Sequence, residues 1–188
     1  MPKLGAKPIR KAALINAAIL EVGRAGSLDV TVAQIARRAG MSPALAHHYF
    51  GSKEQIFLAA MAYILRVYGQ TVAQGLPGQG PRGRLDAIIA ASFAPINFQR
   101  ETVSAWLNFY ALALTSPQAA RLLRVYHLRL RSNLVVALRG LVPDPLQVAG
   151  TLGALIDGVY LRAVLTPGPI DASAALRVVQ TYLDEALT

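Results

Sequence analysis

The sequence predicts an all-α protein, with a small N-terminal head and a larger helical body. Apolar residues recur at helical spacing along most of the chain, and no segment shows a convincing strand-like alternation. Glycines and prolines interrupt this pattern where helix ends are expected. The most distinctive stretch is 31–53, in which two short helical segments are joined by a glycine turn. This pattern indicates a helix-turn-helix.

Three short helices are expected to form the head. The first ends before Gly26, which interrupts the apolar stripe of that helix. Gly40 allows the turn within the helix-turn-helix, and Ser42, followed by a proline, is the expected N-cap of its second helix. Small or apolar residues at the crossing let the two helices pack at a steep angle. The expected helix spans are 9–25, 31–39 and 42–48.

A long fourth helix is expected to connect the head with the body. Ser52 is its expected N-cap, and the helical pattern runs to about Gln74. The Gly- and Pro-rich stretch 75–83 then breaks the helix, and further prolines separate the later ones. These later helices are expected at 84–94, 101–115, 117–141, 145–165 and 172–187. We therefore divide the chain into a head over 8–68, with the helix-turn-helix at 31–50, and a body over 69–188.

Positive charge is concentrated at the N-terminal end of the chain. Of 188 residues, 19 are Lys or Arg and 10 are Asp or Glu, which gives a formal net charge of +9. Residues 1–53 hold eight of the basic residues, including all four lysines, against two acidic ones. A strongly basic end joined to a less charged body favours a polyanionic partner such as DNA, although small basic proteins with other roles are common.

Composition argues against several other classes of protein. The chain has no Cys, which excludes disulfides and thiolate metal sites, and we expect no cofactor. Its first residues lack the apolar run of a signal peptide. The longest apolar stretch, 145–165, contains Asp157 and Arg162, which a membrane span would rarely carry. We therefore expect a cytoplasmic protein with no membrane partner.

Several motifs together resemble the TetR family of repressors, and within it the choline-responsive regulators of glycine betaine synthesis. The family pattern T-x-x-x-I-A-x-x-A-G-x-S spans Thr31 to Ser42. Further matches extend over nearly the whole chain. They are Met1-Pro2-Lys3-Leu4-Gly5, His48-Tyr49-Phe50, Ala105-Trp106-Leu107, Ser132-Asn133-Leu134-Val135 and Ala154-Leu155-Ile156-Asp157-Gly158. The resemblance implies a homodimer that binds a palindromic operator in double-stranded DNA and responds to a small molecule, here choline.

The second helix of the helix-turn-helix carries the residues expected to read DNA. Ser42 and His47 can hydrogen-bond to base edges, whereas Pro43 and Ala44 offer apolar contact. This set is sparse, so phosphate contacts should supply much of the affinity. Candidates for these phosphate contacts are Lys7, Arg10, Thr31, His48, Tyr49 and Lys53.

The end of this helix departs from the family pattern. Members commonly close it with two tyrosines and a histidine, where this chain has His47-His48-Tyr49. His48 and Tyr49 can therefore either touch the DNA backbone or pack beneath the fourth helix. Phe50 is expected in the core, and Arg37 is expected with Arg38 on a solvated face.

Aromatic residues of the body are the candidate effector site. Trp106, Phe109 and Tyr110 stand three and four positions apart, hence on one helix face. In the family the body holds the effector cavity, and Trp and Tyr faces attract quaternary ammonium groups through cation–π contacts. The alternative is that this stripe belongs to the ordinary core.

One carboxylate stands out in the same part of the chain. Asp157 lies in an apolar helix, where a buried carboxylate needs a partner. That partner is Arg162, a backbone group or a bound cation. Tyr160, close by on the same helix, either completes an aromatic cage or belongs to the dimer core.

Two helices, 117–141 and 145–165, are expected to hold the dimer together. The second of these has small residues that allow a close approach of another helix, unless they pack within one subunit. These residues are Ala149, Gly150, Gly153, Ala154 and Gly158. The arginines of 117–141 are expected to form its solvated flank.

Other functions fit the sequence less well. His127 stands among arginines without a catalytic triad or metal-ligand spacing, so we do not expect an enzyme. One alternative keeps the DNA-binding head but assigns another cationic or lipophilic effector to the body. A more remote alternative is an interaction protein that senses no ligand.

Overall fold

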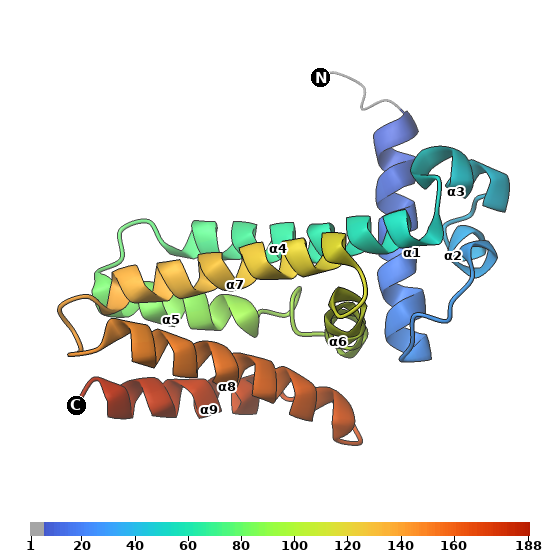
Figure 1. The fold of residues 1–188 in the computed structure, drawn as a ribbon. Coiled ribbons are helices and arrows are strands. Elements are labelled where there is room, and N and C mark those ends of the chain that lie inside the picture. The colour runs from blue at the N-terminus through green and yellow to red at the C-terminus, as the bar shows by residue number, and fades with distance from the viewer. Residues whose placement is uncertain (1–5) are drawn as a thin grey trace.

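The computed structural model describes residues 6–188, and this range folds into nine helices without a strand (Figure 1). The all-α prediction is confirmed. Met1–Gly5, which carry part of the family resemblance, lie outside the described residues. The helices are α1 (Ala6–Ala25), α2 (Val32–Arg38), α3 (Pro43–Phe50), α4 (Lys53–Gly75), α5 (Pro81–Ser92), α6 (Arg100–Ala113), α7 (Pro117–Leu138), α8 (Pro145–Leu165) and α9 (Ala172–Ala186).

Helices α1, α2 and α3 form the head, and local sequence sets their ends. Thr31 caps α2 in a capping box, in which Gln34 donates its backbone N–H to the Thr31 side chain and accepts the Thr31 N–H in return. Ser42 caps α3 by accepting a backbone N–H from the first turn. Gly40 lies between the two helices with a φ of +68°, a left-handed conformation that favours glycine.

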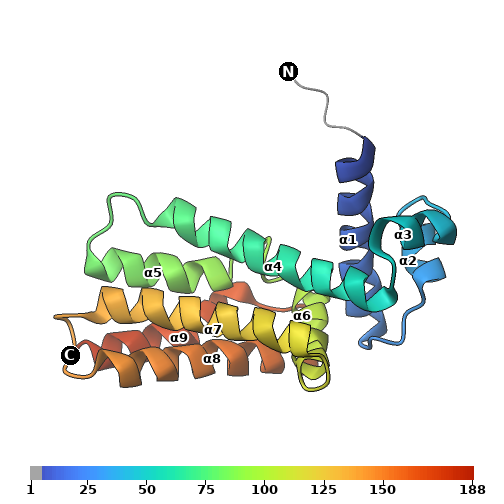
Figure 2. The same ribbon diagram turned by 45° about the horizontal axis from the view of Figure 1, so that its top comes forward.

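The body is a layered bundle that α4 enters from the head. Figures 1 and 2 show α4, α5 and α7 side by side, with α8 and α9 as an antiparallel pair on the other side. Leu85, Leu134, Leu152 and Val179 lie fully buried between these layers. The α6 helix crosses between head and body and is seen nearly end-on in Figure 1.

Several helix boundaries differ from the sequence prediction by up to three residues, and two of these shifts have a clear local cause. The α5 helix begins at Pro81 rather than at 84, because a proline in the first turn gives up an N–H that would have no helical partner there. The α7 helix ends at Leu138 rather than at 141, since Gly140 adopts a left-handed φ of +76° and closes it. The end of a helix depends on a few residues, whereas its existence depends on many.

The head rests on α6 through a very close contact. Apolar residues of α1, α2 and α4 share one core with Trp106 and Phe109 of α6. A Cβ added at Gly23 of α1 would lie 2.2 Å from the backbone oxygen of Glu101 in α6. Because backbone meets backbone there, no side chain can turn aside, and Gly23 sets the distance between α1 and α6.

Replacing Gly23 should therefore loosen the head from the body. We expect Gly23→Ala to lower the free energy of unfolding by roughly 1–3 kcal/mol, the usual cost of overpacking. Gly69→Ala in α4 is the control, since nothing lies within 4 Å of its added Cβ. That change should stabilise the helix by about 0.5–1 kcal/mol. Thermal unfolding with equal midpoints for both variants would contradict the close contact.

Candidate functional site

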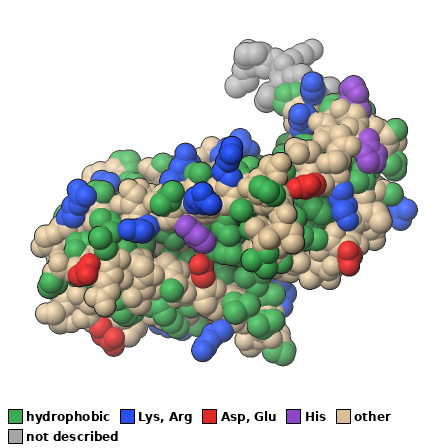
Figure 3. All heavy atoms as spheres, viewed as in Figure 1, with side chains coloured by type: hydrophobic (Ala, Val, Ile, Leu, Met, Phe, Trp, Pro, Cys, Tyr) green, Lys and Arg blue, Asp and Glu red, His purple; other side chains and the backbone are tan. Residues whose placement is uncertain are grey.

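The outer surface of α3 presents the predicted base-reading residues together. Ser42, Pro43, Ala44 and His47 are all exposed. Figure 3 shows His side chains on the outer face of the head, with Lys and Arg side chains near them. His47 Nδ1 lies 3.3 Å from the carbonyl oxygen of Gly51, which leaves Nε2 uncommitted within the described chain. This face offers the His47 ring, the apolar Pro43 and Ala44, and the Ser42 hydroxyl, whose oxygen also caps α3.

Basic residues from α1 and α4 flank the end of α3. Lys7 and Arg10 are exposed on α1, and Arg10 donates a hydrogen bond of 3.4 Å to the Tyr49 hydroxyl. Lys53, at the start of α4, donates to the backbone oxygen of Leu28 at 3.3 Å. The positive charge expected at phosphates is thus held near the recognition helix by partners within the head.

The remaining DNA candidates have different surroundings. His48 is exposed, whereas Tyr49 is half-buried and packs edge-to-face against it, with ring centres 5.5 Å apart. Thr31 is exposed, but its side chain and backbone N–H are engaged in the capping box of α2. Arg38 pairs with Glu21 on α1, so its charge is partly compensated.

Inside the body, four helices place aromatic side chains around a narrow cavity of about 20 Å³. The aromatic walls are Tyr68 of α4, Trp106 of α6, Tyr126 of α7 and Tyr160 of α8. The Tyr126 ring packs edge-to-face against both Trp106 and Tyr68, with ring centres 5.3 and 5.6 Å apart. Ile64, Leu65, Asn97 and Thr102 complete the lining.

A polar cluster adjoins this cavity, and we call Tyr110, His127 and Asp157 the polar cluster from here on. Tyr110 donates a hydrogen bond of 2.8 Å to Asp157 Oδ1, and its ring packs 5.3 Å from that of Trp106. His127 Nε2 lies 3.4 Å from the Tyr110 hydroxyl and 3.7 Å from Asp157 Oδ2. Helices α6, α7 and α8 therefore meet around one carboxylate.

Burial raises the pKa of Asp157 and of the tyrosines in and beside the polar cluster. Desolvation raises the pKa of Asp157 above its ordinary 3.8, while the hydrogen bond from Tyr110 and the charge of His127 offset part of that rise. Burial likewise raises the pKa of Tyr68 to about 12. The other tyrosines of the site shift in the same direction, chiefly through burial. Their hydroxyls are therefore neutral hydrogen-bonding groups near pH 7.

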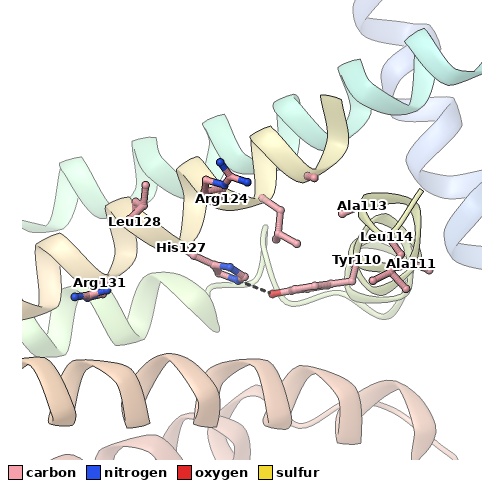
Figure 4. A pocket seen from close by; sticks show the side chains of 10 residues that line it. Tyr110, Ala111, Ala113, Leu114, Arg124, His127, Leu128 and Arg131 are labelled. Atoms are coloured by element: carbon pink, nitrogen blue, oxygen red, sulfur yellow. Dashed lines mark hydrogen bonds between the residues drawn. The ribbon is translucent and has the colours of Figure 1, made fainter. Parts of the chain in front are cut away.

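A larger depression, of about 550 Å³, opens on the surface between α6 and α7. In Figure 4, Tyr110 and His127 point toward each other on one side of it. Its walls combine apolar side chains with two arginines, and these residues are Ala111, Leu114, Leu128, Arg124 and Arg131. The polar cluster thus lies between an open surface depression and the narrow aromatic cavity.

The residues predicted for ligand binding do not share one environment. Trp106 lines the cavity, Tyr110 belongs to the polar cluster, and Phe109 is fully buried in the core that joins α6 to the head. Tyr160 lines the cavity, and its hydroxyl donates to the backbone oxygen of Ser92. Helical spacing correctly places these three α6 residues on one face. However, α6 is packed against several elements, so neighbouring residues on that face contact different parts of the protein.

Asp157 does not pair with Arg162. The two residues are five positions apart on α8, so they face different directions, and Arg162 is exposed. The partner of Asp157 is Tyr110, with His127 beside it. The sequence prediction did not include Tyr126 and His127 among the site residues, because they stand among arginines and leucines. The only signal for them in the sequence was that two ring-bearing residues are adjacent.

Two models of known protein families match this chain, one over the DNA-binding head and one over the body. Residues 14–60 match the model of the bacterial regulatory proteins of the tetR family. Residues 81–188 match that of the C-terminal domain of BetI-type transcriptional repressors. The chain belongs to the TetR family. Within this family, the HTH-type transcriptional regulator BetI of Brucella anthropi is 47% identical over 97% of this chain and 96% of its own length. That of Agrobacterium fabrum is 45% identical over 100% and 92%.

Solved structures of the family share this fold. A transcriptional regulator from Saccharomonospora viridis in complex with choline superposes with a TM-score of 0.82 and 20% identity, over 94% of this chain and 96% of that one.

The α4 and α8 helices are long and apolar enough to cross a membrane. Both are packing helices of this TetR fold, and α8 buries Leu152 and Ile156 in the body core. The chain is a TetR-family transcriptional regulator with a BetI-type C-terminal domain.

The raised pKa of Asp157 predicts a stability effect. A carboxyl whose pKa rises on folding destabilises the folded state at any pH where it is ionised. We expect Asp157→Asn to raise the unfolding midpoint at pH 7, since the amide oxygen still accepts from Tyr110. The advantage should shrink as the pH falls through the raised pKa toward 3.8.

Thermal unfolding at pH 7 and pH 4 measures this effect. The exposed N-cap Asp171 supplies the control, because Asn caps a helix about as well as Asp. Asp171→Asn should change the midpoint little at either pH. A lower midpoint for Asp157→Asn at pH 7 would mean that the ionised carboxylate stabilises the fold.

Proposed function

We propose that this chain is a homodimeric repressor that binds a palindromic operator, responds to choline and regulates genes of glycine betaine synthesis. The aromatic cavity beside Asp157 carries the choice of effector. Aromatic faces attract a quaternary ammonium ion by about 0.5–2 kcal/mol each, and a nearby carboxylate adds to this. The choline complex of the S. viridis regulator, which has the same fold, supports the choice.

The cavity must widen to admit such a ligand. Its volume of about 20 Å³ suits a single water molecule, whereas ligand pockets occupy roughly 300–1,000 Å³. A depression of about 350 Å³ between α4 and α7 shares Leu65, Tyr68 and Tyr126 with the cavity. Turning the two tyrosine rings would join the spaces, so we place ligand entry between α4 and α7.

The exposed face of α8 supports the dimer. Leu146, Leu161 and Leu165 are 54%, 47% and 71% exposed. The exposed Gly150, Ala154 and Gly158 lie between these leucines in a row three or four positions apart. An apolar row with small residues at its centre fits a second copy of the helix closely. We propose that α8 packs against its partner, with α7 beside it as expected from the sequence.

Two contacts support coupling between the body and the head. Trp106 belongs both to the cavity wall and to the core shared with α1. Ser116, which caps α7, donates a hydrogen bond of 2.7 Å to Glu54 at the start of α4. Widening the cavity would therefore move α6 and the start of α7 relative to the head. A ligand shifts the spacing of the two heads by binding one arrangement better than the other.

We assign operator contacts to the residues that the head gathers around α3. His47 and Ser42 read base edges, and Pro43 and Ala44 add apolar contact. The phosphate contacts come from Lys7, Arg10 and Lys53, with His48, Tyr49 and Thr31 at the margin of the surface. We retain the division into a DNA-binding head over 8–68 and a sensing body over 69–188, in a cytoplasmic protein.

Lys53 offers a direct test of phosphate binding. Lys53→Ala should weaken binding to specific and unrelated DNA alike and reduce the slope of log K against log salt by about 1. Arg139→Ala, at the exposed end of α7 far along the chain from the head, removes the same charge and should leave the slope unchanged. Fluorescence anisotropy at several salt concentrations measures both variants. An unaltered slope for Lys53→Ala removes this residue from the DNA surface.

The effector assignment is tested by calorimetric titration with choline. Trp106→Leu, which keeps an apolar side chain, should weaken choline binding by about 2- to 30-fold, and Trp106→Phe should weaken it less, because a ring remains. The neutral analogue 3,3-dimethylbutanol has carbon in place of the ammonium nitrogen and should bind wild-type protein far more weakly. Absence of choline binding, or equal binding of choline and the neutral analogue, rejects choline as the effector.

A further inference from the structure

Two buried hydroxyls beside the aromatic cavity lack a well-formed hydrogen bond within the described chain. They belong to Tyr68, which lines the cavity, and to Ser92, which is 1% exposed. A buried hydroxyl usually forms a hydrogen bond, because leaving it without one destabilises the fold. Two such groups beside one cavity leave donor and acceptor capacity for a third hydroxyl.

The two hydroxyls are neighbours although different helices carry them. Tyr68 is on α4 and Ser92 ends α5, yet their hydroxyls lie close enough for a weak mutual hydrogen bond, which offsets part of the rise that burial causes in the pKa of Tyr68. The Tyr160 hydroxyl donates to the backbone oxygen of Ser92. Asn97, which lines the same cavity, is held by a 2.7 Å hydrogen bond to the oxygen of Ala91. One side of the aromatic cavity is therefore polar.

Charge restricts what this polar side can bind. The cavity is lined by aromatic, aliphatic, Asn and Thr side chains, with no Lys or Arg among its described residues. The nearby charged group is the carboxylate of Asp157, which belongs to the adjoining polar cluster. A ligand carboxylate placed here would be buried without a counter-ion. A neutral hydroxyl attached to a cation fits both sides of the cavity.

Resting on the choline assignment above, we propose that Tyr68 and Ser92 form a hydroxyl subsite that selects quaternary ammonium alcohols. The Tyr68 O–H donates to the alcohol oxygen, and the Ser92 oxygen accepts the alcohol proton. The aromatic rings hold the ammonium group at the same time. The regulator thereby distinguishes an alcohol from the same cation without a hydroxyl, and from a trimethylammonium carboxylate.

Three ligands and three variants test the subsite by calorimetry on the full-length protein. The ligands are choline, ethyltrimethylammonium, which lacks the hydroxyl, and trimethylglycine, which carries a carboxylate. Wild-type protein should prefer choline to ethyltrimethylammonium by about tenfold, the worth of one or two neutral hydrogen bonds. Trimethylglycine should bind at least about tenfold more weakly than choline, since its carboxylate has no counter-ion in the cavity.

The variants assign that preference to the two hydroxyls. Tyr68→Phe should reduce the preference to within about twofold by weakening choline binding alone, and Ser92→Ala should remove part of it. Tyr182→Phe makes the same chemical change in the body core on α9 and should keep the full preference. Tyr68→Phe should also unfold at a midpoint close to that of wild type, because its hydroxyl has only a weak partner in Ser92 to lose.

The outcomes separate the subsite from the choice of effector. If choline and ethyltrimethylammonium bind wild-type protein equally well, choline remains an effector and the hydroxyl subsite is rejected. A preference that survives in Tyr68→Phe also rejects the subsite, and means that the hydroxyls serve bound water instead. If neither cation binds, both the effector assignment and the subsite are rejected.

Discussion

Where α1 crosses α6, the backbone at Gly23 touches the backbone at Glu101 with no side chain between them. Backbone contacts of this kind fix a distance, because neither side can yield by changing a rotamer. The same α6 helix carries Trp106, whose ring forms part of the cavity wall. The position of the head on the body and the shape of the cavity therefore both depend on α6, which packs backbone to backbone against α1 of the head.

The head is well ordered, but few of its polar side chains are free of partners and ready to contact DNA. Capping bonds at Thr31 and Ser42 fix the ends of α2 and α3, so the recognition helix is preformed rather than induced. Several of its polar groups have partners within the head, such as Lys53 on the oxygen of Leu28. In the DNA complex that we propose, phosphates would replace these weak exposed contacts, which favours positioning over specificity and fits a pair of heads on a palindromic operator.

The sequence predicted the fold well, and it identified some of the residues that line the aromatic cavity. Helical periodicity and capping residues identified all nine described helices, and errors arose at ends set by single residues such as Pro81 and Gly140. The site was harder because its members come from four helices. Spacing along α6 could group Trp106 with Phe109 and Tyr110, but the crossing of α6 over α1 separates Phe109 from the others. Likewise Asp157 found its partner on α6 rather than on its own helix.

If the effector enters the narrow aromatic cavity, as we propose, the tightness of that cavity affects the ligand concentration at which the regulator responds. If the open form is a small fraction of the population, the apparent dissociation constant exceeds the intrinsic one by the inverse of that fraction. The concentration at which the regulator responds is then set partly by core packing, and not by ligand contacts alone. Substitutions that change how often Tyr68 and Tyr126 swing apart would adjust the response threshold without touching the ligand. Evolution can thus tune such a sensor through residues remote from its chemistry.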